Sequence, residues 1–150
     1  LYVRILTYPM PVIAAICGNV FGGGAVLACA CDFRFMRSEQ CHLCFPEINL
    51  GLPFLPGMWA IVRKAMPEYL ARETVLTGRK VDAFELHEHQ AISKVYNENR
   101  LVMEEAVAYA KSFSKKRSTF AEMKRRMNRE IIDVIEKNDP PLIESLKLLA

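Results

Sequence analysis

The sequence lacks the cysteine framework of a disulfide-rich protein and the strong positive charge of many nucleic-acid-binding proteins. Its five cysteines are an odd number and form no short framework, so we expect reduced thiols in an intracellular compartment rather than a disulfide scaffold. A net charge of only +3 gives no indication of a nucleic-acid partner. With 51% hydrophobic and 25% charged residues, the 150-residue chain has the composition and length of one globular domain.

Two phosphate-binding motifs are also missing. The glycines between Gly18 and Gly24 do not have the G-x-G-x-x-G spacing of a dinucleotide-binding turn. No lysine follows the triple glycine, which excludes a Walker loop. Nucleotide chemistry of these two kinds is therefore not expected.

One apolar stretch raises the question of a membrane. Between Val12 and Cys31 the only polar side chain is Asn19, and the stretch is long enough to cross a bilayer. Its glycines, Asn19 and the prolines before it interrupt the run, so we expect no membrane span, with a transmembrane helix as the alternative. Arg4 is the only basic residue before it, a poor match to a signal peptide. Because the sequence begins with Leu1, we expect a fragment or a processed product.

The apolar pattern predicts an α/β chain that becomes helical after residue 57. Strands are expected at 12–17, 32–37, 41–45 and 92–96. Helices are expected at 1–8, 25–30, 58–65, 67–78, 82–86 and 101–113, and from Ser118 to the Asp139-Pro140-Pro141 segment. Residues 46–56 are expected to form a loop, and Asp82 to cap the helix that follows it.

The triple glycine at 22–24 lies between a predicted strand and a predicted helix. The first N–H groups of a helix have no intrahelical acceptor, and the helix dipole there favours negative charge. Such a turn can hold a phosphate or a developing oxyanion. The alternative is close packing of the helix on the strand.

Glu47 is the strongest candidate for acid–base chemistry. It lies between apolar residues, on a predicted loop rather than on a helix surface. Partial desolvation would raise its pKa and make it a usable base near neutral pH. The alternative is a structural carboxylate that caps nearby backbone N–H groups.

Two other groups of residues have plainer interpretations. The pairs Cys29/Cys31 and Cys41/Cys44, with His42, could be drawn as a zinc site, but their positions favour small buried apolar residues. Basic residues between 111 and 129 indicate the solvated face of an amphipathic helix, with contact to an acidic ligand or a partner subunit as the alternative.

Several blocks occur in a fixed order: PVIAAICG (11–18), GGG (22–24), CDFR (31–34), FPEINLG (45–51) and LPG (55–57), followed by LTG (76–78) and ISKV (92–95). Together they resemble the enoyl-CoA hydratase/isomerase (crotonase) superfamily. The resemblance implies an α/β fold, a spiral of ββα units of which this chain is the C-terminal portion. Residues 1–113 would belong to the core, and 114–150 to helices that pack a homotrimer or another oligomer.

Members of that superfamily stabilise a thioester enolate with two backbone N–H groups. The resemblance implies that Gly23 supplies one of them, while the other belongs to a segment upstream of Leu1 in a missing N-terminal half. Glu47 matches a family glutamate and becomes the expected catalytic base. The residues expected at the substrate are Gly22, Val26, Leu50, Pro53 and Phe54. The acyl-CoA thioester is then the substrate, and no metal or other cofactor is implied.

One departure from the family pattern narrows the choice among the activities of the family. Hydratases of the family carry a second glutamate two residues after the glycine triplet, where this chain has Val26. Moving a double bond needs only one base, which takes a proton from C2 and returns it to C4. Val26 with Glu47 therefore resembles a Δ3,Δ2-enoyl-CoA isomerase of fatty-acid β-oxidation, in a mitochondrion or a peroxisome.

Two alternatives stay open at this point. A non-catalytic crotonase-like subunit of a larger assembly is favoured by the absent N-terminal half and by the basic helix after residue 117. Gln90 also stands where the family usually has a glycine, and a left-handed residue there would cost about 1 kcal/mol. The second alternative is a hydratase that takes its other acid from elsewhere.

Overall fold

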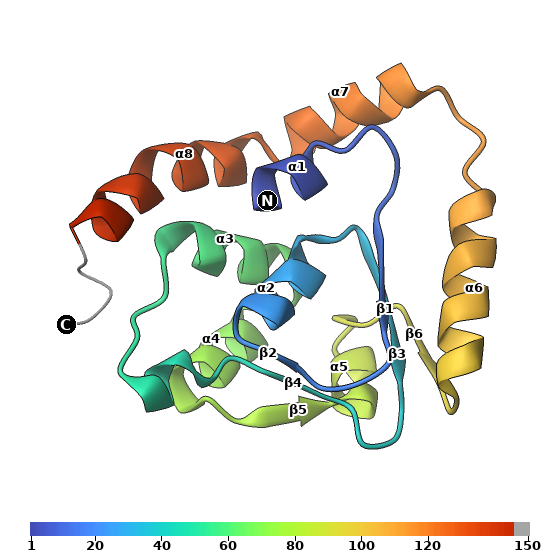
Figure 1. Ribbon diagram of the computed structural model, residues 1–150, viewed down its shortest axis with the longest axis horizontal. Coiled ribbons are helices and arrows are strands. Elements are labelled where there is room, and N and C mark those ends of the chain that lie inside the picture. The colour runs from blue at the N-terminus through green and yellow to red at the C-terminus, as the bar shows by residue number, and fades with distance from the viewer. Residues whose placement is uncertain (146–150) are drawn as a thin grey trace.

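Two small sheets lie at the centre of the computed structural model, which describes residues 1–145 (Figure 1). The first sheet is entirely parallel and has the order β1-β3-β6. Its strands are β1 (Ile13–Ile16), β3 (Phe33–Arg37) and β6 (Lys94–Tyr96). The second sheet has the order β2-β4-β5, with β2 and β4 parallel and β5 antiparallel to β4. Its strands are β2 (Val20–Phe21), β4 (His42–Cys44) and β5 (Lys80–Asp82).

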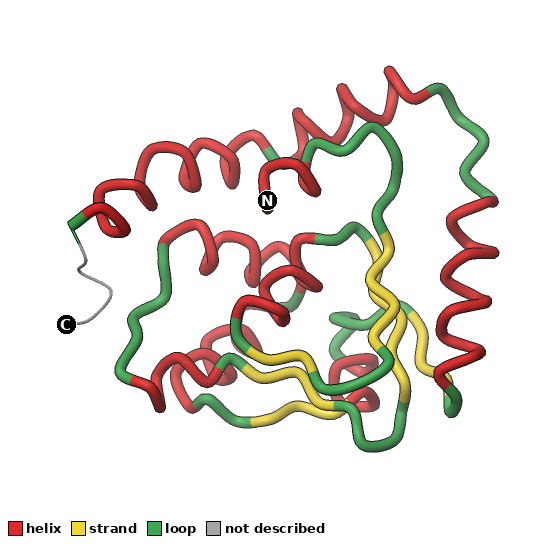
Figure 2. Tube along the Cα trace, viewed as in Figure 1, coloured by secondary structure: helices red, strands yellow, loops and turns green. Residues whose placement is uncertain are grey.

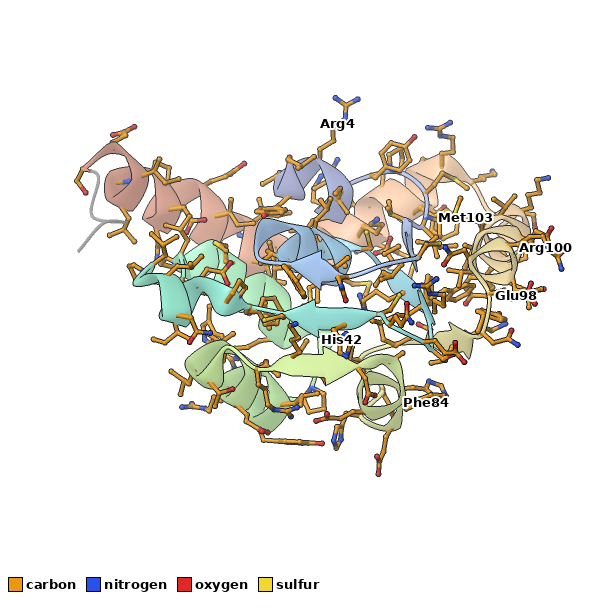
Figure 3. All side chains as sticks on the ribbon, turned by 60° about the horizontal axis from the view of Figure 1, so that its bottom comes forward. Arg4, His42, Phe84, Glu98, Arg100 and Met103 are labelled. Atoms are coloured by element: carbon orange, nitrogen blue, oxygen red, sulfur yellow. The ribbon has the colours of Figure 1, made fainter. Side chains whose placement is uncertain are left out.

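Helices surround these sheets on several sides (Figure 2). The first half of the chain contributes α1 (Tyr2–Leu6), α2 (Gly23–Ala30), the 3₁₀-helix η1 (Pro46–Leu50) and α3 (Pro56–Ala65). The second half contributes α4 (Glu68–Thr77), α5 (Ala83–Glu88), α6 (Asn99–Lys111), α7 (Arg117–Met127) and α8 (Arg129–Glu144). The outer sides of α5 and α6 carry exposed side chains such as Phe84 and Met103 (Figure 3).

The short helix α2 is the centre of the main core. Its residues Val26 and Cys29 have no exposed surface, and they belong to one cluster with Ile61 of α3 and Leu70 of α4. At about 25 cal/mol per Å² of apolar area removed from water, such burial supplies most of the favourable free energy of folding. The core therefore fixes α2 between the second sheet and α3.

The C-terminal end of α2 is capped by cations from other elements, because its own last turn contains no basic residue. Arg34 Nη1 donates to the carbonyl of Cys31 at 2.8 Å. Lys64 Nζ donates to the carbonyls of Ala30 and Cys31 at 3.3 and 3.1 Å. Cations at this end complement the helix dipole and satisfy carbonyls that lack an intrahelical donor.

The two C-terminal helices return to the beginning of the chain. Lys124 of α7 pairs with Asp32 at 2.5 Å and is almost completely buried, unlike the other basic residues of that stretch. Asn128 donates to the carbonyl of Leu6 at 2.8 Å. Asp139 of α8 accepts the N–H of Gly57 at 2.8 Å, close enough that a Cβ at position 57 would collide with the carboxylate. Figure 1 shows α1 beside the junction of α7 and α8.

The structure corrects the predicted helix that begins at Ser118. It is two helices, because Asn128 leaves helical geometry (φ −103°, ψ 8°) to reach Leu6. The second helix then continues through Pro140 and Pro141 to Glu144. Each proline removes one helical N–H, and the Asp139 contact with Gly57 lies beside them and holds α8 against α3.

Other predicted elements differ only in detail. The 46–56 segment was expected to be a loop, but its first five residues form η1. The strands β2 and β5 were not predicted, since two or three residues give no measurable period. Asp82 caps α5 as predicted, accepting from the backbone N–H groups of Phe84 and Glu85 at 2.9 Å. Gln90 has a left-handed backbone, with φ 60°, so the helix does not avoid the strained conformation at this position.

Candidate active site

The start of α2 presents free backbone N–H groups. Gly22 has φ 55° and ψ −127°, a conformation that only glycine adopts readily, and its N–H donates to the carbonyl of Cys44 at 3.0 Å. Its carbonyl accepts the N–H of Val26 at 3.0 Å and so begins the helix. The next two amides, of Gly23 and Gly24, precede the first intrahelical donor, and both residues are exposed. An anionic oxygen can therefore approach this turn.

The carboxylate of Glu47 lies directly beside this turn. Its Oε1 atom is 3.3 Å from the point that a Cβ on Gly22 would occupy. Its Oε2 atom is buried and has no hydrogen-bond partner among the described residues. Burial raises the pKa of this carboxyl, and a hydrogen bond from its own backbone N–H offsets part of the rise. A carboxylate with a buried, unpartnered oxygen and a raised pKa is suited to take up a proton.

The 3₁₀-helix η1 holds Glu47 in this position. Pro46 begins η1, and Gly51 ends it in the left-handed conformation, with φ 68°. The N–H of Leu52 donates to the carbonyl of Glu47 at 2.9 Å, which closes the turn. Local sequence therefore fixes the backbone on both sides of the carboxylate.

A second glycine turn, at Gly78, supports η1 from the end of α4. A Cβ at position 78 would lie 2.5 Å from Asn49 Nδ2 and 3.0 Å from Ile48 Cγ2, so a larger residue would displace these side chains of η1, and φ 63° also favours glycine. The thiol of Cys44 donates to the carbonyl of Gly78 at 3.2 Å. These contacts connect the segment that carries Glu47 to the helical part of the molecule.

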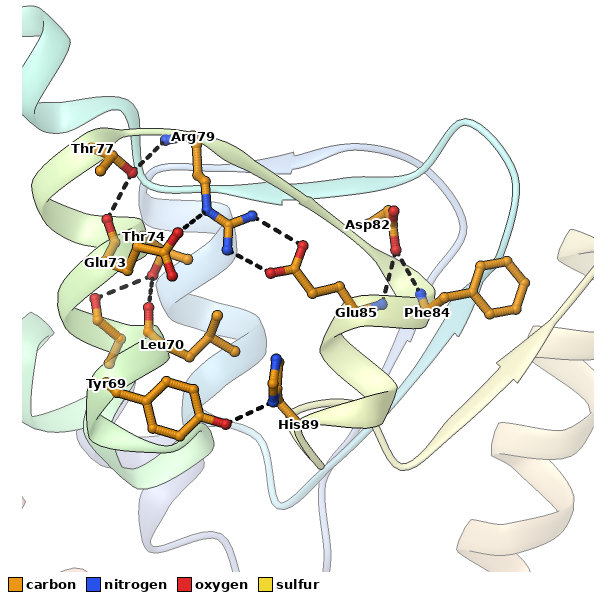
Figure 4. A network of polar contacts seen from close by, with 11 residues as sticks. Tyr69, Leu70, Glu73, Thr74, Thr77, Arg79, Asp82, Phe84, Glu85 and His89 are labelled. Carbon is orange, nitrogen blue, oxygen red and sulfur yellow. Dashed lines mark hydrogen bonds and ion pairs between the residues drawn. The ribbon is translucent and has the colours of Figure 1, made fainter.

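Arg79 fixes that turn in place (Figure 4). Its guanidinium binds the carboxylate of Glu85 through two bonds, at 2.5 and 3.0 Å, and that of Glu73 at 2.8 Å. Both partners lower the energy of the charged guanidinium and raise the pKa of Arg79. On the same side, the hydroxyl of Tyr69 lies 2.7 Å from Nδ1 of His89, which joins α4 to the end of α5. The network links α4, β5 and α5.

The structure brings together only part of the predicted site. Glu47, Gly22 and Gly23 meet at the start of α2. Val26 is a correction, since its side chain has no exposed surface and packs in the core. Leu50 is 65% exposed at the end of η1, and Pro53 is exposed as well.

Phe54 is half-buried and packs edge-on against Phe45, with ring centroids 5.6 Å apart. It borders an apolar cavity of about 480 Å³. The other residues that line this cavity are Pro56, Trp59, Arg72, Val75 and Leu76. The cavity has a volume typical of small-molecule sites.

Two features near the site were not predicted from the sequence. Tyr2 of α1 donates its hydroxyl to the carbonyl of Gly23 at 3.4 Å. On the second sheet, Lys80 lies over the ring of Phe21, with Nζ 5.6 Å from the centroid, directly before the glycine turn. No signal in the sequence links Tyr2 to Gly23, whereas the Phe21–Lys80 contact follows from strand pairing in which Cys44 lies between them.

The described residues were also searched for a metal site and for a membrane-spanning helix. Within residues 1–145, no group of three or more His, Cys, Asp or Glu side chains is placed to hold a metal ion. All five cysteines are free, and four of them are buried. No helix of the described part of the chain is both long and apolar enough to cross a bilayer.

Comparison with known proteins gives concordant results. A putative enoyl-CoA hydratase of Thermus thermophilus is 33% identical over 120 residues, which are 79% of this chain and 46% of the relative. A probable enoyl-CoA hydratase of Rhizobium meliloti is 39% identical over 106 residues, 69% of this chain and 40% of the relative. This chain thus spans less than half the length of these curated relatives.

The fold also matches solved structures. The crystal structure of a probable enoyl-CoA hydratase from Mycobacterium tuberculosis superposes with a TM-score of 0.88 over 98% of this chain and 62% of that chain, at 18% identity. This match shows the fold, which is crotonase-like, as the sequence predicted. The model of the enoyl-CoA hydratase/isomerase family matches residues 1–138. The chain therefore belongs to the enoyl-CoA hydratase/isomerase family.

Proposed function

We propose that this chain carries the proton-transfer site of an isomerase that converts 3-enoyl-CoA to 2-enoyl-CoA. The single observation that carries the proposal is the carboxylate of Glu47, with one buried and unpartnered oxygen, beside the free amides at the start of α2. The substrate is an acyl-CoA thioester, which contains the CoA group itself.

The first step removes a proton from C2 of the thioester. Glu47 accepts that proton, and the electron pair of the C–H bond delocalises onto the thioester oxygen to give a dienolate. The N–H of Gly23 donates a hydrogen bond to this oxygen. A preorganised donor of this kind contributes about 10²–10³-fold to rate, because the bond strengthens as negative charge develops.

The second step returns the same proton to C4. The electron pair on oxygen re-forms the carbonyl, the double bond moves to C2–C3, and Glu47 is again ionised. No water is consumed and no second acid is needed. The residue type at position 26 supports this assignment, because valine offers no polar group where hydratases of the family carry their other glutamate.

A second candidate function is hydration of 2-enoyl-CoA. The curated relatives from Thermus thermophilus and Rhizobium meliloti are named as enoyl-CoA hydratases, which favours it. Hydration needs a group to activate water and another to deliver a proton to carbon. In this case Glu47 would perform one task, and an acid outside α2 would perform the other.

Assays of the full-length protein on 3-enoyl-CoA and 2-enoyl-CoA in parallel distinguish these functions. Glu47→Gln is expected to lower isomerisation about 10²–10⁴-fold with little change in thioester binding, because only the proton acceptor is lost. Glu88→Gln, on the exposed side of α5, is the matched control. Unchanged turnover in Glu47→Gln, or water addition faster than isomerisation, would contradict the proposal.

The pH dependence gives a separate check. Isomerisation requires ionised Glu47, so kcat is expected to fall as pH drops through the pKa of that carboxyl. Burial places this pKa above the ordinary value of 4.5. An acid limb with a midpoint at or below that value would contradict the assignment.

A further inference from the structure

Tyr2 extends its phenol from α1 to the glycine turn. Its hydroxyl lies 3.4 Å from the carbonyl oxygen of Gly23 and 3.7 Å from the point that a Cβ on Gly23 would occupy. Glu47 approaches the adjacent Gly22 in the same way. The phenol and the carboxylate thus flank two consecutive glycines, and the amide between these glycines is the free N–H of Gly23.

We propose that Tyr2 is a further catalytic residue, whose hydroxyl donates a hydrogen bond to the thioester oxygen held by the N–H of Gly23. This inference rests on the proposed function. It gives the site, from this chain alone, one backbone donor and one side-chain donor to the enolate oxygen.

The present hydrogen bond of Tyr2 can be exchanged for a ligand. An O–H···O bond is typically 2.7–2.8 Å long, whereas the bond to the Gly23 carbonyl measures 3.4 Å in an exposed setting. Such a long bond contributes little free energy. An enolate oxygen is a stronger acceptor than the Gly23 carbonyl, because it carries negative charge and hydrogen bonds to charged groups are about twice as strong as neutral ones.

The phenol remains a donor at neutral pH. Its partial burial and the nearby charge of Glu47 both raise the pKa of Tyr2 above its ordinary value. The hydroxyl therefore keeps its proton while Glu47 is ionised. This division gives the site a neutral donor for the oxygen and a charged acceptor for the carbon-bound proton.

The backbone of α1 is held firmly enough to position this group. Leu6, at the end of α1, has no exposed surface, and its carbonyl accepts a hydrogen bond from Asn128. Thr7 also donates its hydroxyl to the carbonyl of Val3 at 2.8 Å. A rigid support matters because hydrogen-bond donors act in catalysis only when they are already oriented.

The test measures the bound thioester carbonyl by difference infrared spectroscopy, using the full-length protein and 2-enoyl-CoA labelled at that carbonyl. Loss of a donor raises the carbonyl stretching frequency, so Tyr2→Phe is expected to shift the band upward. Replacement of Tyr2 by 3-fluorotyrosine, a more acidic phenol, is expected to shift it downward. The control is Tyr8→Phe, which changes a 41% exposed tyrosine just after α1 and is expected to leave the band unchanged.

Kinetics complete the test. Tyr2→Phe is expected to lower kcat about 10²-fold and to change KM little, because the donor acts mainly on the charged intermediate. A bound carbonyl band that is the same in wild type, Tyr2→Phe and the fluorotyrosine variant would overturn the inference. If Tyr2→Phe does not fold, the nearly isosteric fluorotyrosine variant decides the question.

The spectroscopic result is separate from the proposed function. A band shift in a protein that does not isomerise 3-enoyl-CoA would support Tyr2 as an oxygen donor and contradict the isomerase assignment. Isomerisation without a band shift would support the isomerase assignment and contradict Tyr2 as an oxygen donor. Absence of any enoyl-CoA binding by the wild-type protein would overturn both.

Discussion

Alanine substitutions at Gly22 and Gly24 are expected to have opposite effects on folding, although the two residues are separated by one position. At Gly22, φ 55° and ψ −127° lie in a region that costs a residue with a Cβ about 1–3 kcal/mol. The new methyl would also lie 3.3 Å from Oε1 of Glu47, so the carboxylate would have to move. Gly22→Ala should therefore lower the free energy of unfolding by about 1–3 kcal/mol and lower isomerase activity.

Gly24 provides the control for this reasoning. It lies in the first turn of α2 with a negative φ, and nothing lies within 4 Å of the point that its Cβ would occupy. Gly24→Ala should raise the free energy of unfolding by about 0.4–1 kcal/mol, because alanine restricts the unfolded chain. Urea unfolding followed by circular dichroism measures both variants. Equal changes in the two would refute the assignment of strain to Gly22.

Two further substitutions test other parts of the structure. Burial raises the pKa of Asp139, so the folded state binds a proton at this carboxyl more tightly than the unfolded state does. The free energy of unfolding therefore falls as pH rises from the ordinary pKa of 3.8 to the raised pKa of the folded state. Asp139→Asn keeps an oxygen acceptor for the Gly57 N–H and should remove this decrease in stability with pH. Urea unfolding at several pH values measures the effect. The same dependence of stability on pH in the variant and the wild type would contradict the prediction. Gln90→Gly should stabilise the protein by about 0.5–1 kcal/mol in thermal unfolding, because φ 60° favours glycine, and a lower midpoint would show that the Gln90 side chain has a compensating role.

The sequence was sufficient to predict those features that depend on neighbouring residues. The strand, glycine turn and helix between residues 12 and 30 follow from apolar runs and from the glycines and prolines that bound them. Asp82 likewise has the local pattern of an N-cap. Glu47 and Gly23 were selected for the same reason, since each lies in a short block with a characteristic order of residues, and their roles stay predictions. Their proximity requires pairing of β2 with β4, which the sequence did not predict.

The remaining features depend on contacts between distant parts of the chain. Asn128 interrupts a helix because Leu6 offers a carbonyl, and no local pattern carries that information. Tyr2 approaches Gly23 only when α1 packs on α2. The packing of η1 on the turn at Gly78 likewise joins segments that are distant in the sequence. The division at residue 113 and the oligomer expected from 114–150 stay predictions.

The contacts that join α7 to the beginning of the chain have a consequence for synthesis on the ribosome. The carbonyl of Met10 accepts a hydrogen bond from Lys124, which comes 114 residues later in the chain. The carbonyl of Leu6 accepts one from Asn128, which comes 122 residues later. These carbonyls stay bonded to water until that far segment has emerged from the exit tunnel. Helix α1, which carries Tyr2, consequently reaches its final environment only after α7 has been synthesised, and closures between such distant segments are slow.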